Sequence, residues 1–227
     1  MTVEVKICGL NDADALEAAI GAGTDLVGFV FYPPSPRHLD LASAGELAER
    51  ARGRAGIVAL MVDPDDAGVV DVAEAVRPDY IQLHGSEGVT RVGEIARLTG
   101  IDIIKAVKVA SARDVAAGES YRTVAARLLY DAKTRDDAPG RLPGGNGIAF
   151  DWRLLAGVDR TTGYLLSGGL DPTNVAAALA LTGAPAIDVS SGVESAPGRK
   201  DTRLIREFLE AAKRAPARDN IEACNHV

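Results

Sequence analysis

The chain has 227 residues, of which 47% are hydrophobic and 25% charged, a balance that excludes a disordered, collagen-like or low-complexity protein. Its 32 acidic and 25 basic residues give a net charge of −7, which argues against a general nucleic-acid or anionic-membrane binder. Two cysteines, Cys8 and Cys224, are too few for a disulfide framework, and without a signal peptide or membrane-spanning run we expect a cytoplasmic protein with reduced thiols.

Short apolar runs alternate with longer amphipathic runs rich in Ala and Leu, almost to the end of the chain. The short runs predict strands at residues 3–8, 26–31, 56–62, 80–83, 103–107, 127–131, 164–167 and 187–189. The longer runs predict helices at residues 12–22, 43–52, 67–76, 88–98, 111–117, 150–156, 172–181 and 201–213. Asp12 or Asn11 is expected to cap the first helix. Asp171 followed by Pro172 is expected to open the seventh, with proline at the first helical position.

The predicted strands are continuous apolar blocks, which is typical of parallel strands covered on both faces. Eight right-handed strand–helix units close most naturally into a single (β/α)8 TIM barrel of the α/β class, with eight parallel strands. A doubly wound open sheet is the alternative. We assign residues 1–214 to the barrel domain and residues 215–227, which show no periodicity, to a flexible C-terminal tail.

Residues 133–149 interrupt the alternation, because they are rich in Pro and Gly and long for a loop between a strand and a helix. They follow the sixth predicted strand, so in a barrel they would stand at the face where strand ends and loops carry function. We expect either a mobile lid or a disordered surface insertion there.

The loops after the seventh and eighth predicted strands have the composition of an anion site. Gly168 and Gly169 follow the seventh strand, and Ser190, Ser191 and Gly192 follow the eighth. Glycines let backbone N–H groups approach an anion, serine hydroxyls add donors, and a short helical turn starting near Ser191 would point its positive end inward. Because barrels commonly bind phosphate in these two loops, we expect a small phosphorylated molecule as the ligand.

Two residues that end strands are candidates for acid–base chemistry. Cys8 ends the first strand, where an ionised thiol can accept a proton, although an inert small core residue is the alternative. Asp131 ends the sixth, where a carboxylate needs either a catalytic role or a partner such as a cap or an ion pair with Lys133. A substrate lying between Cys8 and Asp131 would meet a base on one side and an acid on the other.

Four further residues are candidates for substrate binding. Arg37, in a segment stiffened by three prolines, suits bidentate binding of a carboxylate, with an exposed surface arginine as the alternative. His84 is interpreted as a hydrogen-bonding wall of the pocket rather than a proton carrier. Asp188 would bind a sugar hydroxyl or orient the phosphate loop. Lys6 would neutralise Asp188 or the carboxylate that ends the sixth strand, or lower the pKa of the thiol on its own strand.

Metal-binding and cofactor motifs do not occur in the sequence. The 3 histidines lie in unrelated contexts, and there is no HxH, HExxH, Walker A or GxGxxG pattern. We therefore expect chemistry without a metal or a cofactor, and a protein that binds neither nucleic acid nor a membrane.

Six motifs in chain order resemble the phosphoribosylanthranilate isomerase family of tryptophan biosynthesis. They are VKICGL (5–10), GFVF (28–31) with SPR (35–37), QLHG (82–85), DAK (131–133), SGGLDPTNV (167–175) and DVSSGVE (188–194). The resemblance runs from residue 3 to about residue 208, and GGNG (144–147) with FDW (150–152) is similar to the family's loop and helix after strand six.

The resemblance implies an Amadori rearrangement of N-(5-phosphoribosyl)anthranilate to 1-(o-carboxyphenylamino)-1-deoxyribulose 5-phosphate, the third step from chorismate to tryptophan. By this resemblance Cys8 is the general base and Asp131 the general acid. Arg37 holds the anthranilate carboxylate, and the two glycine-containing loops hold the phosphate. The protein would act as a monomer or homodimer.

Three other functions remain open from the sequence. The related aldose–ketose isomerase of histidine biosynthesis, or a bifunctional relative, is the nearest, but that group has an aspartate where this chain has Cys8. A Schiff-base aldolase would use Lys6 or Lys105. A non-catalytic sensor would bind a phosphorylated ligand without converting it.

Overall fold

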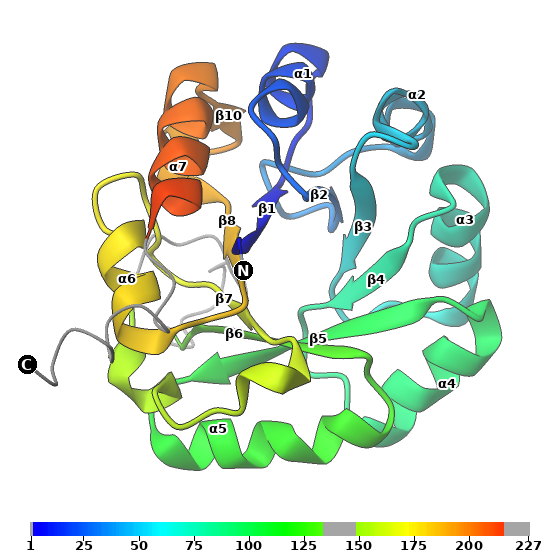
Figure 1. Ribbon diagram of the computed structural model, residues 1–227. Helices are drawn as coiled ribbons and strands as arrows, with labels where there is room; N and C mark the ends of the chain where they lie inside the picture. The colour runs from blue at the N-terminus through cyan, green and yellow to red at the C-terminus, as the bar shows by residue number, and fades with distance from the viewer. Residues whose placement is uncertain (1, 134–148, 216–227) are drawn as a thin grey trace, which may run out of the picture.

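Eight parallel strands close into a barrel in the computed structural model, which describes residues 2–133 and 149–215 (Figure 1). Each strand pairs with the next along the chain, and β8 pairs with β1 to complete the ring. The strands are β1 Glu4–Cys8, β2 Leu26–Phe31, β3 Gly56–Met61, β4 Tyr80–Leu83, β5 Asp102–Val109, β6 Arg127–Ala132, β7 Leu165–Leu166 and β8 Ala186–Val189. The predicted single (β/α)8 barrel with eight parallel strands is confirmed.

Helices surround the ring on its outer side, as Figure 1 shows. The α-helices of the described residues are α1 Ala13–Gly21, α2 Leu41–Ala51, α3 Asp66–Val76, α4 Val89–Thr99, α5 Ala112–Gly118, α6 Val175–Thr182 and α7 Thr202–Arg214. Short 3-10 helices are η1 Glu119–Thr123, η2 Trp152–Leu155, η3 Arg160–Thr162 and η4 Ser191–Val193. A small antiparallel hairpin, β9 Glu194–Ala196 with β10 Arg199–Lys200, follows β8 and was not predicted.

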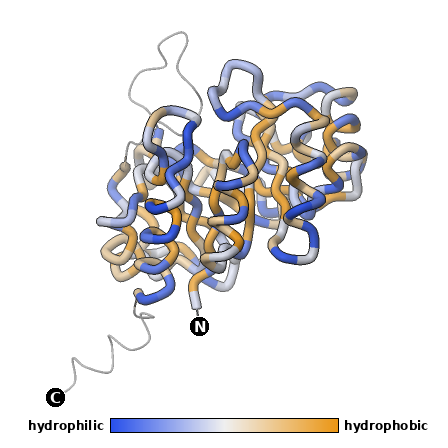
Figure 2. The backbone as a smooth tube through the Cα atoms, turned by 90° about the horizontal axis from the view of Figure 1, so that it is seen from above, coloured by the Kyte–Doolittle hydropathy of each residue, from blue (hydrophilic) through white to orange (hydrophobic). Residues whose placement is uncertain are grey.

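Alternation along the strands builds two apolar regions, because successive side chains of a strand point to opposite faces. The outward side chains pack against the helices in one large cluster. Figure 2 colours the backbone by hydropathy, and hydrophobic stretches run through the interior of the fold. The inward side chains of the lower barrel form a second apolar cluster, made of Leu26, Val58, Ile104, Ala106, Leu129, Leu165 and Ala186. These layers close the bottom of the barrel, so an accessible site lies at the carboxyl ends of the strands.

Aspartate caps start many of the helices where the sequence indicates. Asp12 accepts a hydrogen bond from Ala15 N at 2.8 Å, which confirms the expected cap of α1. Asp201 does the same for α7, accepting from Arg203 N and Leu204 N. A side-chain oxygen at this position satisfies a backbone donor that the helix itself leaves unpaired.

The predicted start of the seventh helix and the predicted sixth helix are wrong. α6 begins at Val175 rather than at Pro172, because Asp171 Oδ1 accepts from Thr173 N at 2.7 Å while Asn174 Oδ1 accepts from Asp171 N at 2.9 Å. These reciprocal bonds hold residues 171–174 in a turn. The helix expected at 150–156 is reduced to η2, a single 3-10 turn capped by Asp151.

Some expectations concern residues outside the described part of the chain. Most of the loop 133–149, including the motif at 144–147, and all of the tail 215–227 except Ala215 belong there, as do Cys224 and His226. The assignment of residues 1–214 to a single domain stays a prediction. No helix within residues 2–133 and 149–215 combines the length and apolar character needed to span a bilayer.

Candidate active site

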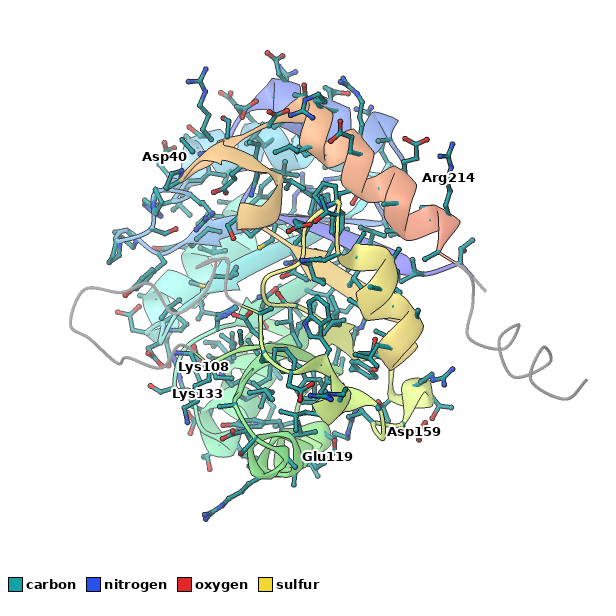
Figure 3. The ribbon with its side chains drawn as sticks, turned by 90° about the vertical axis from the view of Figure 1, so that its left-hand side faces the viewer. Asp40, Lys108, Glu119, Lys133, Asp159 and Arg214 are labelled. Carbon is teal, nitrogen blue, oxygen red and sulfur yellow. The ribbon has the colours of Figure 1, made fainter. Side chains whose placement is uncertain are left out.

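The carboxyl ends of the strands share one side of the molecule. Figure 3 shows Lys108 of β5 and Lys133, which follows β6, at that side, whereas Asp159 before β7 and Arg214 at the end of α7 lie at the other. Many of the inward positions near this mouth are polar, in contrast to the apolar layer below. They include Lys6 and Cys8 on β1, Gln82 on β4, His84 just after it, Asp131 on β6, Ser167 just after β7, and Asp188 on β8.

Lys6 and Asp188 form a buried ion pair across the seam between the first and last strands. Lys6 Nζ lies 2.7 Å from Asp188 Oδ1, and Ser167 Oγ donates to Asp188 Oδ2 at 3.0 Å. Of the partners considered for Lys6, the structure therefore selects Asp188 over Asp131. Burial opposes the charge on Lys6, but Asp188 and Cys8 outweigh it and raise the lysine pKa.

Cys8 faces the upper barrel beside this ion pair. Its side chain packs with Val30 and Leu60, and only 3% of the residue is exposed. Burial raises the pKa of the Cys8 thiol, and the nearby Lys6 ammonium acts against that rise. The free thiol is therefore mostly protonated at neutral pH, and its ionisation depends on the cation that lies beside it.

Asp131 is hydrogen-bonded to His84 rather than to Lys133. Asp131 Oδ2 lies 3.1 Å from His84 Nε2, and Asp131 Oδ1 accepts from Ala132 N at 2.9 Å. Lys133 Nζ instead lies 3.8 Å from Asp114 Oδ1, so the alternative of a Lys133–Asp131 ion pair is wrong. His84 Nδ1 in turn lies 2.9 Å from Gln82 Nε2. The three side chains form one buried chain of contacts from β4 to β6.

Arg37 is buried rather than exposed on the surface, with 5% of the residue accessible. Its guanidinium meets Glu194 side-on, with Nε 2.7 Å from Oε1 and Nη2 2.8 Å from Oε2. It also packs over the backbone of Gly9, where a Cβ would lie 2.6 Å from Arg37 Cδ and 3.3 Å from Ser190 Oγ. Only glycine at this position lets the arginine and the serine loop meet beside Cys8.

Glu194 and Lys200 are site residues that the sequence reasoning missed. Lys200 Nζ lies 2.8 Å from Glu194 Oε1 and donates to Ser190 O at 2.9 Å, which links the β9–β10 hairpin to the serine loop. Burial lowers the pKa of the Lys200 ammonium. Burial also acts to raise the pKa of the Glu194 carboxyl. The hydrogen bond from Arg37 and the charge of Lys200 outweigh this effect, so the pKa of Glu194 is lowered. The available signal was a glutamate two residues after the glycine of the serine loop.

The two glycine-containing loops lie beside Asp131 and Ser190. Gly168 has φ +87°, and a Cβ there would lie 2.7 Å from Ala132 N and 3.2 Å from Asp131 Oδ1. Hydrogen bonds among the described residues do not use the backbone N–H groups of Gly168 and Gly169. η4 begins at Ser191, as expected from the sequence. Unpaired backbone donors at this end of a barrel suit an anion.

The arrangement combines a thiol beside a cation, a carboxyl held by a histidine, and a Gly-Gly loop whose N–H groups are unused among the described residues, all at the carboxyl ends of barrel strands. This fold and this mouth define the chain as a (β/α)8-barrel enzyme of the kind that handles small anionic substrates.

Comparison with known proteins identifies the family. The family described as N-(5'phosphoribosyl)anthranilate (PRA) isomerase matches residues 5–211, and this chain belongs to it. It is 52% identical over 217 residues to the N-(5'-phosphoribosyl)anthranilate isomerase of Rhizobium meliloti (strain 1021), covering 96% of this chain and 100% of that protein. It is 51% identical to the protein of the same name from Rhodopseudomonas palustris (strain BisB5), covering 94% of this chain and 97% of that one.

Solved structures agree with this assignment. The crystal structure of phosphoribosyl anthranilate isomerase from Thermotoga maritima has a TM-score of 0.81 and 36% identity, covering 93% of this chain and 99% of that one. Phosphoribosyl anthranilate isomerase in complex with reduced 1-(o-carboxyphenylamino)-1-deoxyribulose 5-phosphate has a TM-score of 0.80 and 34% identity, with the same coverage.

Proposed function

We propose that the protein isomerises N-(5'-phosphoribosyl)anthranilate to 1-(o-carboxyphenylamino)-1-deoxyribulose 5-phosphate, the third step from chorismate to tryptophan. Membership of the family supports this activity. The observation that carries it is the order of the barrel: Cys8 on β1 and Asp131 on β6 are separated by β7 and β8. The loops after these two strands include Gly168 and Gly169, whose backbone N–H groups make no hydrogen bond among the described residues. A phosphate held by those loops would lie between a base and an acid.

The first step is opening of the sugar ring. Asp131 gives its proton to the ring oxygen, the bond between C1 and that oxygen breaks, and the lone pair of the anthranilate nitrogen forms a C=N bond. The product is an open-chain Schiff base. His84, in contact with Asp131 Oδ2, holds the carboxyl toward the site throughout this step.

The second step is proton abstraction at C2. The Cys8 thiolate takes the C2 proton, the C2 electron pair forms a C1=C2 bond, and the C=N electrons return to nitrogen. The resulting enolamine tautomerises to the ketone, with C2 oxidised and C1 reduced inside one molecule. Each positioned acid or base contributes about 10²- to 10⁴-fold, so orientation of the substrate must supply much of the remaining acceleration.

Binding of both ends of the substrate supplies that orientation. The phosphate is assigned to Gly168, Gly169, Ser190, Ser191 and Gly192. At the other end Arg37 is assigned to the anthranilate carboxylate; its contact with Glu194 fixes the plane of the guanidinium, which makes bidentate binding geometrically selective. Asp188, already bound to Lys6 and Ser167, is assigned to orienting the phosphate loop.

The proposed partner is a small phosphorylated substrate, and the proposed oligomeric state is a monomer or homodimer. A related isomerase from Thermotoga maritima is described as dimeric, and its solved structure as that of monomers generated from the dimer. We also propose that the protein works in the cytoplasm, because its charged phosphorylated substrate does not cross membranes unaided; cell fractionation tests this location.

An activity assay tests the proposal directly. Purified protein is mixed with freshly generated phosphoribosylanthranilate, and the loss of anthranilate-type fluorescence is followed over time. The aldose substrate of the histidine-pathway isomerase is assayed in parallel. Turnover of the first compound supports the proposal, whereas turnover of the second alone assigns the protein to the rival isomerase. Stable binding without turnover would identify a sensor instead.

Two substitutions test the assigned acid and base. Cys8→Ala and Asp131→Asn should each lower kcat by about 10²- to 10⁴-fold while leaving binding of the reduced product largely intact, because the lost group acts mainly in the transition state. Steady-state kinetics and a binding titration measure both effects. Near-normal turnover by either variant would remove that residue from its role.

A further inference from the structure

Gln82 is a buried polar residue for which the reaction described above has no use. It faces the barrel interior on β4, two residues before His84, and is 0% exposed. Its Nε2 lies 2.9 Å from His84 Nδ1, and His84 Nε2 lies 3.1 Å from Asp131 Oδ2. Among the described residues, Gln82 Oε1 has no hydrogen-bond partner. An orphaned acceptor inside a barrel costs stability, so it calls for an explanation.

With the amide nitrogen of Gln82 facing His84, the contacts correspond to one particular proton count. An amide nitrogen only donates, so His84 Nδ1 must accept from Gln82 and the ring carries its proton on Nε2. That proton points at Asp131 Oδ2, whose partner oxygen already accepts from Ala132 N. Both carboxyl oxygens therefore accept, and Asp131 is a carboxylate. The arrangement is that of the general acid after it has given its proton away.

Adding one proton to the His84–Asp131 pair changes what His84 Nδ1 needs from Gln82, from a hydrogen-bond donor to an acceptor. The proton resides either on Asp131, which then donates to His84 Nε2, or on the ring, which then carries hydrogen on both nitrogens. In both cases His84 Nδ1 bears hydrogen and needs an acceptor. The Gln82 amide supplies one only by turning half a revolution, which brings Oε1 to Nδ1.

We propose that Gln82 is a positioning residue whose amide turns by half a revolution each time the His84–Asp131 pair gains or loses its proton. The inference rests on the proposed role of Asp131 as general acid. Each orientation makes one hydrogen bond to His84 and leaves the other amide atom unpaired, so the two orientations are closely balanced. A neutral amide thus accommodates both proton states without burying a further charge.

Other charged groups near the pair do not supply this acceptor. Lys108 on β5 lies in register with Asp131, but an ammonium only donates. Asp188 on β8 is bound to Lys6 and Ser167, and Cys8 on β1 packs against Val30 and Leu60. Gln82 is therefore the group whose contact with His84 Nδ1 sets the tautomer of the ring.

Two substitutions separate this role from simple packing. Gln82→Glu supplies a permanent acceptor, which holds the proton-loaded pair to higher pH, so the high-pH limb of the kcat profile should move up by about one unit and kcat should fall. Gln82→Leu fills much of the same space without any acceptor, so that limb should not move up, and kcat should fall about 10-fold with KM nearly unchanged. Ile104→Val, at the position paired with Gln82 on β5, is the matched control and should leave the limb in place.

A second measurement does not depend on turnover. NMR of protein labelled with ¹⁵N at histidine should show the His84 proton on Nε2 above the limb and protonated Nδ1 below it. In Gln82→Glu, Nδ1 should remain protonated to higher pH. The proposal is overturned if His84 keeps the Nε2–H tautomer at every pH or if the limb of Gln82→Glu does not move. If the wild-type protein fails to turn over phosphoribosylanthranilate, the proposed function fails, while the NMR titration still decides the proton count.

Discussion

The thiol of Cys8 has an ionisation that its neighbours control from opposite directions. Burial raises its pKa and so does the Asp188 carboxylate, whereas Lys6 lowers it, as does the more distant Lys200. A base that stays protonated until substrate arrives is protected from side reactions of the thiolate. The ion pair between Lys6 and Asp188 therefore acts on the pKa of the Cys8 thiol as well as joining two strands.

Substituting either member of this ion pair should shift the pKa of the Cys8 thiol, and the two shifts should have opposite directions. Lys6→Met removes the cation and should move the thiolate titration further above its ordinary value of 9.0, whereas Asp188→Asn should move it down. Thiolate absorbance at 240 nm measures the titration, with Cys8→Ser as the blank that corrects for tyrosine and for Cys224. Shifts of the same sign in both variants would show that packing, not charge, controls the thiol.

At the residue scale, the ends of the predicted strands correctly indicated which residues lie at the mouth of the barrel. Contacts between loops could not be predicted from the sequence. Cys8, Asp131 and Asp188 are inward at the mouth because strand alternation and the closed barrel leave little choice. The sequence could not reveal that Arg37 would meet Glu194, since 157 positions separate them and a small hairpin brings them together. The catalytic roles themselves stay predictions until the variants are measured.

At the element scale, a further buried ion pair, between Lys105 and Glu87, holds the loop after β4 on the outer side of the barrel. Lys105 Nζ lies 2.6 Å from Glu87 Oε2 and also donates to Gly85 O at 2.8 Å. Glu87 accepts from the backbone of Gly85 and, at 2.8 Å, of Asp63, which ties the loops after β3 and β4 together. His84 lies at the start of this loop, so the clamp fixes its position. Lys105 is thereby engaged in structure rather than free for Schiff-base chemistry.

Breaking this clamp should destabilise the fold. Glu87→Gln leaves the Lys105 ammonium, 3% exposed at its side chain, without a counter-charge, and should lower the free energy of unfolding by about 3–5 kcal/mol. Urea unfolding measures the loss. The double variant Glu87→Gln with Lys105→Met should lose less than the sum of the two single variants, because the second change removes the unpaired charge. Additive losses would mean that the two groups do not depend on each other.

Element boundaries were less predictable than element types. The eight strands follow from apolar runs, but β7 contains only Leu165–Leu166, because Gly168 turns out of the strand at positive φ. The helix expected at 150–156 has the right composition for an amphipathic helix, yet it is one short turn. Local side-chain hydrogen bonds, such as those between Asp171 and Asn174, compete with the backbone and are invisible to periodicity.

At the scale of the whole molecule, many carboxyl groups make the fold sensitive to acid. Backbone hydrogen bonds at helix starts lower the pKa of three carboxyls, Asp40, Asp159 and Asp201. Hydrogen bonds from arginines lower the pKa of three more, Glu17, Glu49 and Glu119. Because these groups have lower pKa values folded than unfolded, their contribution is present above the ordinary values of 3.8 and 4.5 and is lost as the pH falls through the folded values.

The urea midpoint should therefore fall steadily between pH 5 and pH 3. Tyr130 makes stability depend on pH in the opposite direction at alkaline pH, because burial raises its pKa from 10.0 to about 12 in the folded protein. Its contribution to the free energy of unfolding is therefore lost as the pH rises from 10 toward 12. Equilibrium unfolding at a series of pH values tests both limbs. A midpoint that stays constant from pH 5 to pH 3 would show that the unfolded chain keeps the same carboxyl contacts.

The barrel itself was the most predictable feature, because eight repeats of one supersecondary unit leave few ways to close a sheet. The hydrophobic periodicity of the sequence predicts the strands and the surrounding helices. The parallel strands in turn place their carboxyl ends together at the mouth of the barrel. The hairpin β9–β10 departs from that repeat and carries Glu194 and Lys200, so it could not be inferred from the regular pattern.

The bond between Lys6 and Asp188 spans 182 positions of the chain. During synthesis the ribosome adds the aspartate long after the lysine and the thiol two residues beyond it. Until the last strand docks, Cys8 therefore lies beside Lys6 without the carboxylate and the burial that raise its pKa, so the unfinished chain has a more readily ionised thiol than the folded protein. A product that stops before that strand also lacks the counter-charge that lets Lys6 be buried, so it cannot complete the closed barrel.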